Sequence, residues 1–524
     1  MTNSKVNFGL PGLNLSYVTQ LEVFVSNFQK SFITIFIIAF LSCGCTEISS
    51  IISSESTDKI KIALEHVWKK EPSESADKKV SASPRIVSEH ILNGESSENG
   101  QSIAIAPDGI VWVAGSTENI EGVEASPSQK DDREGWLIGI DPKKSKSEQI
   151  VYNRRFGGNH LDTLYYIAIG KDGIIWLVGQ TNSDAQTGDI PKSAIWGQKV
   201  WILGIDPKKS EDKQIIYNRC FGGDRFLFFR DAAMGEDGVL WIIGHISGSV
   251  GLGDAGDIPL SEDCELWLFG VDPKKNVNKQ IIYNRCLKGD WRKVCLDVGK
   301  DGTLWVVGRT NDSEETEAGD IFNNKYKEQD LWVLGIDPNK SKQIVYGQNF
   351  GGDGYENLAS IAVDEDGILW VLGTTRSKKG SGDIPKGYNI LSEMWLFGID
   401  SKKSEGKQII YNRCFDQKGF LSGSLDFPEV MAIDKDGLIC IAGMTRGSIT
   451  TDIWLTGIDT KKSESAQSVF NQFIYKKDNS DGKVNMPTSI TIGEDGIVWT
   501  TGIFKRNAGN YKYQSELWIV GTKP

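Results

Sequence analysis

A unit of about 64 residues repeats seven times along this chain. Each copy contains an Asp-Gly pair, and the seven Asp residues are Asp108, Asp172, Asp237, Asp301, Asp366, Asp436 and Asp495. The third residue after the Gly is Trp in six copies and Cys440 in the remaining one. Six copies also contain the motif Trp-x-x-Gly-x-Asp, and the last copy ends with Trp518 and Gly521 but lacks the Asp. The two motifs include thirteen of the sixteen Trp residues, which are therefore scaffold residues.

One copy is enough to predict the strands of the unit. Its apolar patterns predict four strands, over residues 166–169, 174–179, 200–205 and 214–218. Asp172-Gly173 predicts a two-residue hairpin between the first two strands. Asp206-Pro207-Lys208-Lys209 predicts a turn between the last two, because Pro presets the backbone angle at its second position. The middle strands are nearly continuous apolar runs, which is typical of sheets that are buried on both faces.

Seven such units predict an all-β chain that folds as a seven-bladed β-propeller of four-stranded antiparallel blades. A ring of this kind protects the edges of its sheets. The last unit has only three strands before Pro524, whereas an extra strand over residues 85–91 precedes the first unit. We therefore expect the N-terminal strand to complete the last blade and close the ring.

The repeat resembles that of the bacterial seven-bladed β-propeller repeat family of secreted and surface proteins. The resemblance covers about residues 85–524 and depends on the segments Ile361-Ala362-Val363-Asp364, Gly179-Gln180-Thr181-Asn182-Ser183, Gly188-Asp189-Ile190-Pro191 and Tyr217 to Gly223. The sixth copy departs from the pattern by losing Trp and Gly-Asp-Ile-Pro, and the seventh loses Phe-Gly-Gly. The resemblance implies a propeller architecture, but it implies neither a reaction nor a single ligand.

The N-terminal segment has the features of an export signal. After Lys30, residues 32–41 form an apolar run of the length of a signal-peptide core, too short to span a bilayer. Leu41-Ser42-Cys43-Gly44-Cys45 then resembles the lipobox of bacterial lipoproteins, with Cys45 as the lipidated residue. The alternatives are an ordinary cleaved signal or an apolar run without a targeting role. We thus predict a signal peptide over 1–45, a tether with a possible short helix over 46–84, and the propeller over 85–524.

Binding is expected on the propeller face that carries the long loops. The Asp-Gly and Asp-Pro-Lys-Lys turns share one face and are short, whereas the opposite face carries long loops and the segments that join successive blades. Aromatic and cationic residues in these segments could stack a sugar or hold a peptide. The candidate ligand-binding residues are Trp196, His160, Arg225, Phe226, Trp291, Arg292 and Tyr355. The alternative is that most of these side chains pack between blades.

The repeated Asp residues and the cysteines are the candidates for metal and disulfide chemistry. The repeated loop residues Asp189, Asp257, Asp320 and Asp383 could bind calcium, but their periodicity favours a role as loop anchors. We expect neither a metal site nor a cofactor. Cys220, Cys286 and Cys414 occupy equivalent positions in different blades, too far apart to pair with one another. Cys264 would lie almost opposite Cys286, so these two could form a disulfide.

The composition and motifs favour a binding protein over an enzyme. A formal net charge of -12 offers phosphate backbones no general attraction, so no nucleic-acid partner is expected. The four His residues have no metal-ligand spacing, and no nucleophile elbow is present. We expect a non-catalytic envelope lipoprotein, at the outer membrane or cell surface or otherwise periplasmic or secreted, that binds a protein or glycan. The alternatives are an extracellular carbohydrate-active hydrolase or lyase, and a structural envelope lipoprotein.

Overall fold

The computed structural model divides the chain into two units, Met1–Lys79 and Val80–Pro524. It describes residues 85–92, 96–119, 133–192, 197–222, 226–247, 257, 264–287, 290–310, 329–378, 380–385, 393–415, 425–446, 451–475, 484–507 and 513–524. All of these belong to the second unit, so the predicted signal peptide, the predicted lipidation site Cys45 and the predicted tether lie outside the described residues. Within the described part, no helix is long and apolar enough to cross a lipid bilayer.

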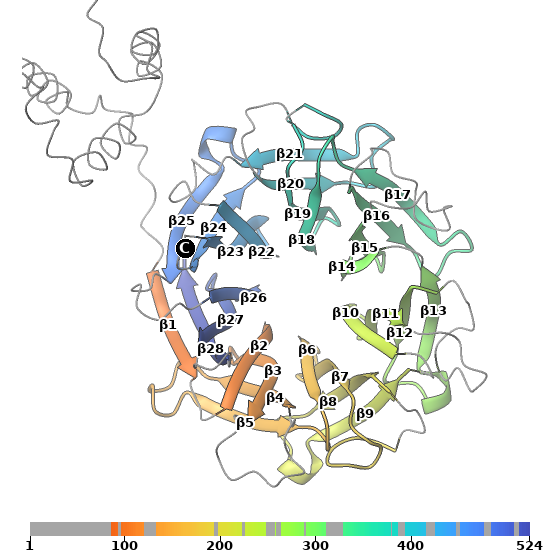
Figure 1. Ribbon diagram of the computed structural model, residues 1–524, viewed down its shortest axis with the longest axis vertical. Helices are drawn as coiled ribbons and strands as arrows, with labels where there is room; N and C mark the ends of the chain where they lie inside the picture. Colours follow the sequence, from red (N-terminus) through yellow and green to blue (C-terminus); the bar gives the residue numbers. More distant parts are fainter. Residues whose placement is uncertain are drawn as a thin grey trace, which may run out of the picture. The chain divides into compact units, whose positions relative to one another are not determined.

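The second unit is a ring of seven four-stranded antiparallel sheets, which confirms the predicted seven-bladed β-propeller (Figure 1). Blades 1 to 3 consist of β2 (Ser96–Ile105), β3 (Val111–Asn119), β4 (Arg133–Ile140), β5 (Ile150–Phe156); β6 (Asp162–Ile169), β7 (Ile175–Thr181), β8 (Lys199–Ile205), β9 (Ile215–Phe221); and β10 (Phe226–Met234), β11 (Leu240–Ser247), β12 (Leu266–Val271), β13 (Ile281–Leu287). Blades 4 and 5 consist of β14 (Asp290–Val298), β15 (Leu304–Arg309), β16 (Leu331–Ile336), β17 (Ile344–Phe350); and β18 (Glu356–Val363), β19 (Leu369–Thr375), β20 (Glu393–Ile399), β21 (Ile409–Phe415). Blades 6 and 7 consist of β22 (Leu425–Ile433), β23 (Leu438–Arg446), β24 (Thr451–Asp459), β25 (Ser468–Tyr475); and β26 (Val484–Ile492), β27 (Val498–Asn507), β28 (Tyr513–Lys523) with β1 (Arg85–Leu92). Short 3-10 turns at Glu211–Lys213, Val277–Lys279 and Glu464–Ala466 precede three of the outer strands.

The N-terminal strand completes the last blade, as the strand count predicted. β1 pairs with β28 in the sheet order β1-β28-β27-β26, with a register that runs from Arg85 opposite Lys523 to Leu92 opposite Leu517. In Figure 1, β1 forms the outer edge of blade 7 while the chain continues into blade 1. This strand thus links the first and last blades covalently.

The two Trp motifs occur together because they pack against each other across neighbouring strands. Trp112 lies opposite Gly139, the Gly of the Trp-x-x-Gly-x-Asp motif, and Trp176 lies opposite Gly204. A Cβ atom on Gly139 would lie 2.9 Å from the Trp112 indole, which is too close for a side chain. In the sixth blade Cys440 replaces this Trp, and the ring of Phe470 covers the corresponding Gly457 instead.

The Asp-Gly turns are three-residue loops, so the predicted two-residue hairpin was wrong. In blade 2 the Gly173 amide donates to the Gly170 carbonyl, and the Gly170 amide donates to the Ile174 carbonyl. Gly173 has a φ of 79°, in the left-handed region that favours glycine. This is the tight turn followed by a left-handed residue that longer hairpins use. The Asp172 carboxylate accepts a hydrogen bond from the Ile174 amide and stabilises the turn.

Neighbouring blades are joined by hydrogen bonds on both their outer and inner strands. On the outside, the Tyr152 hydroxyl donates to Gln214 of the next blade at 3.0 Å, and Tyr217 donates to Gln280 in the same way. On the inside, a side chain on the innermost strand of one blade accepts a hydrogen bond from a backbone amide on the innermost strand of the following blade. Ser102 accepts from Ile167, Ser489 from Ile103, Asp231 from Leu296 and Asp297 from Val363.

Cys264 and Cys286 form a disulfide within blade 3. Cys286 lies on β13 opposite Trp267, and Cys264 precedes the adjacent strand β12. Cys220, at the equivalent position of blade 2, is a buried thiol. The disulfide that the sequence suggested for these two cysteines is therefore present, and it links the segment before β12 to β13.

Candidate binding face

Two loops of blade 2 are tied together at the propeller face opposite the Asp-Gly turns. The first precedes β6 and contains Asn159, and the second follows β7 and contains Asp184 and Thr187. Asn159 donates from Nδ2 to Asp184 Oδ2 at 2.8 Å, and its Oδ1 accepts from the Asp184 amide at 2.9 Å. The hydroxyl of Thr187 donates to the same Oδ1 at 3.1 Å. The loops therefore present one ordered surface.

Blade 5 repeats this arrangement with different residues. Asp353 occupies the position of Asn159, and its Oδ1 accepts from the Lys378 amide at 2.8 Å and from the Ser381 hydroxyl at 3.0 Å. The ammonium of Lys378 lies 3.2 Å from Asp353 Oδ2. In blade 5 an ion pair between Asp353 and Lys378 thus takes the place of the side-chain hydrogen bond between Asn159 and Asp184 in blade 2.

A buried carboxylate supports each loop pair from below. Asp162 in blade 2 accepts from the Gly158 amide at 2.7 Å and from the Ser183 hydroxyl at 2.8 Å. At the equivalent position of blade 5, Glu356 accepts from Thr375 at 2.7 Å and Ser377 at 2.6 Å. Burial raises the pKa of both carboxyls above the usual range, although these hydrogen bonds act in the opposite direction.

Each loop pair presents a large apolar side chain to solvent at the same position. Leu161 in blade 2 is 38% exposed and Tyr355 in blade 5 is 42% exposed. The carbonyls of both residues accept a backbone hydrogen bond from the second loop, Leu161 from Asn182 and Tyr355 from Arg376. Phe226, the first residue of β10, occupies this position of the repeat in blade 3. An exposed apolar position that repeats around a rim is a feature of a contact surface.

The structure describes only some of the residues that the sequence analysis selected for binding. Tyr355 lies on this rim, and so does His160, whose Nε2 is 3.8 Å from Asp184 Oδ2. Phe226, Trp291 and Arg292 lie in the first residues of β10 and β14, where only the backbone is described. Trp196 and Arg225 fall outside the described residues.

Two other aromatic residues pack against neighbouring strands, one of them between blades and the other within blade 3. Tyr165 stacks on Phe229 of the next blade with ring centroids 5.4 Å apart, and Phe228 stacks on His245 at 6.0 Å. Leu161, Asp162 and Glu356 were not among the binding residues predicted from the sequence. The available signal was a carboxylate at the start of the first strand of blades 2 and 5, followed about 21 residues later by a Ser.

The repeated Gly-Asp residues anchor loops. The Asp189 amide donates to the Gly157 carbonyl at 2.8 Å, and its Oδ2 accepts from the Gly157 amide at 3.3 Å. Asp383 makes the same two bonds with Gly351, and the Asp257 amide donates to the Gly222 carbonyl. Asp320 lies outside the described residues. Over the described ranges, no three His, Cys, Asp or Glu side chains are grouped as metal ligands would be.

Comparisons with known proteins identify no family for this chain. No family model matches the chain, and no curated protein matches it. Among solved structures, a hydrazine synthase of Kuenenia stuttgartiensis is similar at 13% identity with a TM-score of 0.40, covering 76% of this chain and 92% of that one. The polysaccharide lyase Uly1 is similar at 10% identity with a TM-score of 0.42, covering 88% of this chain and 95% of that one. Membership of the bacterial propeller repeat family stays a prediction from the sequence.

Proposed function

We propose that this protein is a non-catalytic cell-envelope binding protein whose propeller presents the rim of long loops to a protein or glycan. The observation that carries the proposal is the repeated loop pair of blades 2 and 5. In each, a buried carboxylate fixes two loops, and an exposed apolar side chain stands at the same position. A rigid scaffold with ordered loops loses little conformational entropy on binding.

The proposed location in the cell envelope depends on the sequence of the first 45 residues. One disulfide in the propeller also supports it. The Cys264–Cys286 disulfide is of a kind that persists in oxidising compartments and is rare in the cytosol. This favours export, which the signal-like segment before Cys45 also predicts.

The binding proposal predicts that the two exposed rim residues contribute to affinity. A Leu161→Ser, Tyr355→Ser double variant should bind an envelope ligand, identified by screening glycans and envelope proteins, at least ~10-fold more weakly than the unaltered protein, because each side chain loses apolar burial. Isothermal titration calorimetry would measure the affinities.

A matched control comes from the outer strands. Ile216 and Val345 are each 42% exposed and lie away from the rim, on β9 and β17. The Ile216→Ser, Val345→Ser variant should keep its affinity. Equal losses in the two double variants, or no ligand for the unaltered protein in the screen, would count against a binding role for the rim.

Export with a lipid anchor predicts a covalent modification at Cys45. Cells that express the protein should incorporate a labelled fatty acid into it, and the Cys45→Ser variant should lose the label. The adjacent Cys43→Ser variant should keep it, because Gly44 directly precedes Cys45. Label in the Cys45→Ser variant would contradict this part of the proposal.

A further inference from the structure

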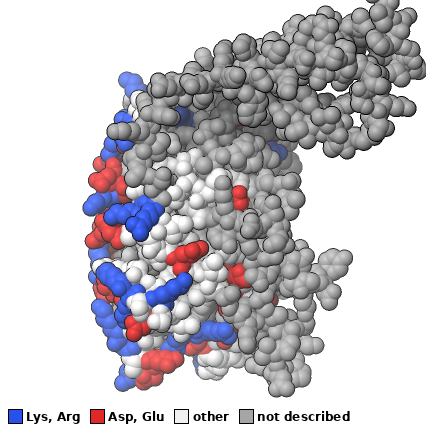
Figure 2. Space-filling view, turned by 90° about the vertical axis from the view of Figure 1, so that its left-hand side faces the viewer, with Lys and Arg blue, Asp and Glu red and all other residues white. Residues whose placement is uncertain are grey.

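The residue before each Asp-Gly pair alternates in charge around the ring. From blade 1 to blade 7 these residues are Pro107, Lys171, Glu236, Lys300, Glu365, Lys435 and Glu494. Lys171 Nζ lies 3.1 Å from Glu236 Oε2, and Lys300 forms ion pairs with both Glu236 and Glu365. An ion pair therefore crosses the junctions between blades 2 and 3, 3 and 4, and 4 and 5. Seen from the side, acidic and basic side chains gather along one edge of the ring (Figure 2).

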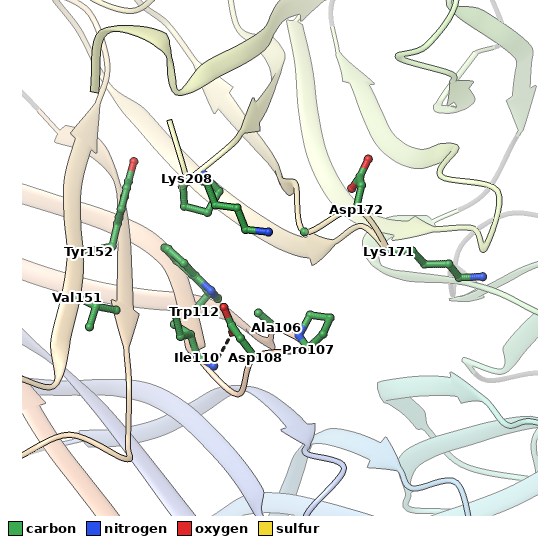
Figure 3. Close-up of a pocket in the computed structure, with 12 residues that line it drawn as sticks. Ala106, Pro107, Asp108, Ile110, Trp112, Val151, Tyr152, Lys171, Asp172 and Lys208 are labelled. Atoms are coloured by element: carbon green, nitrogen blue, oxygen red, sulfur yellow. Dashed lines mark hydrogen bonds between the residues drawn. The ribbon is translucent and has the colours of Figure 1, made fainter. Parts of the chain in front are cut away.

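The junction between blades 1 and 2 cannot form this ion pair, because Pro107 has no charge. Lys171 pairs instead with Glu236 on its other side, and Figure 3 shows its side chain directed away from Trp112. A cavity of about 340 Å³ lies at this junction, within the range of small-molecule sites. The pocket thus lies at one of the junctions that lack this ion pair.

The pocket combines an apolar wall with carboxylates. Its apolar residues include Pro107, Ile110, Trp112 and Pro207. Trp112 is held edge-on to Tyr152, with ring centroids 5.2 Å apart. The carboxylates are those of Asp108 and Asp172, and one oxygen of each accepts a backbone amide of its own turn. The second oxygen of each has no hydrogen-bond donor among the described residues, so it can accept from a ligand.

Lys208 supplies a cation that its counterparts do not. In blades 1, 3, 5 and 6 the lysine at this position donates to the carbonyl of the Asp in its own Asp-Gly turn, as shown by Lys143, Lys274, Lys402 and Lys461. The Lys208 ammonium lies beside Gly173 of its own turn, as the counterparts lie beside theirs, but it forms no hydrogen bond or ion pair within the described ranges, and Lys208 lines the pocket. In Figure 3 its side chain extends between Trp112 and Asp172.

We propose that the pocket between blades 1 and 2 binds a small polyhydroxylated carboxylate, the chemistry of an acidic sugar. Lys208 would pair with the ligand carboxylate, because a cation with no protein partner favours an anion. The open oxygens of Asp108 and Asp172 would accept hydrogen bonds from hydroxyl groups. The half-buried Ile110 and Pro207 offer apolar surface to the C–H face of a sugar ring, whereas Trp112 is 3% exposed and belongs to the scaffold of the wall. This site is on the face of short turns, so it is separate from the rim proposed above.

Titration of the full-length protein with D-glucuronate, with D-glucose as the neutral probe, tests this proposal by calorimetry. The protein should bind glucuronate and prefer it at least ~10-fold over glucose, since a hydrogen bond to a charged group contributes that much. Lys208→Gln should reduce glucuronate affinity at least ~10-fold. Lys274→Gln, the same change in blade 3, should leave it unchanged.

A second variant closes the pocket without removing any of its polar groups. Pro107→Glu restores the alternation of charge and places a carboxylate beside Lys171, so glucuronate binding should be lost. Failure of the unaltered protein to bind glucuronate at about 10 mM would overturn the proposal. Equal binding of glucose and glucuronate would also overturn it, as would equal effects of the Lys208 and Lys274 variants.

Discussion

Deletion of residues 85–92 should lower the free energy of unfolding of the propeller by about 5 kcal/mol. This segment is β1, which pairs with β28 over seven positions. Each backbone hydrogen bond contributes about 1 kcal/mol net, and β28 would become an unpaired edge open to aggregation. The deletion also removes the strand through which blade 1 is covalently continuous with blade 7. Denaturant unfolding followed by Trp fluorescence would measure the loss, at low protein concentration.

A control deletion separates the loss of the strand from truncation in general. Removal of residues 46–84 keeps β1 and should leave the midpoint of unfolding unchanged. Addition of a synthetic peptide of residues 85–95 to the β1 deletion should restore part of the lost stability, because the peptide can pair with β28 in the same register. Equal midpoints for the two deletions would show that ring closure depends on blade packing alone.

The architecture could be predicted from the sequence because each blade is built from local signals repeated at a fixed spacing. The Trp of one motif and the Gly of the other face each other across adjacent strands, as Trp112 and Gly139 do, so their recurrence marks every blade. The loop length of the Asp-Gly hairpins was predicted wrongly, because Asp-Gly is compatible with two-residue and longer loops. Only the backbone angles, such as the φ of 79° at Gly173, distinguish them.

The contacts between blades could be predicted less well, because they depend on residues about one blade apart. Asp231 accepts a hydrogen bond from Leu296, 65 residues later, and nothing local in the sequence marks that contact. The pocket at Pro107 likewise depends on whether Lys171 turns towards blade 1 or blade 3. Sequence patterns identified the face with the long loops, but they did not identify Asp162 and Glu356 as its supports.

The Asp231→Ser variant should be more stable than the unaltered protein above pH 7. Asp231 is half-buried on the innermost strand β10. Burial, with a smaller contribution from the nearby Asp297, raises the pKa of its carboxyl to about 7, although hydrogen bonds from the Leu296 and Ala232 amides and the charge of Lys293 act in the opposite direction. In the unfolded chain the pKa of an Asp is about 3.9. The fold therefore favours the protonated form, and its stability falls as the pH rises from about 4 to about 7. The penalty at alkaline pH is roughly 3 to 4 kcal/mol.

Serine is the right replacement because two other blades already have it at this position. Ser102 and Ser489 each accept the amide of the next blade through a hydroxyl, at 3.3 and 3.2 Å, so Asp231→Ser can keep the inter-blade bond while removing the charge. The gain in unfolding free energy over the unaltered protein should be small near pH 4 and should grow to a few kcal/mol by pH 8. The reciprocal Ser102→Asp change should produce the opposite pH dependence in blade 1. Chemical denaturation at several pH values would measure both effects. Parallel curves of unfolding free energy against pH for the unaltered protein and Asp231→Ser would mean that Asp231 is ionised in the fold at no cost. Part of the pH dependence should persist in the Asp231→Ser variant, because burial also raises the pKa of Asp297, to about 6.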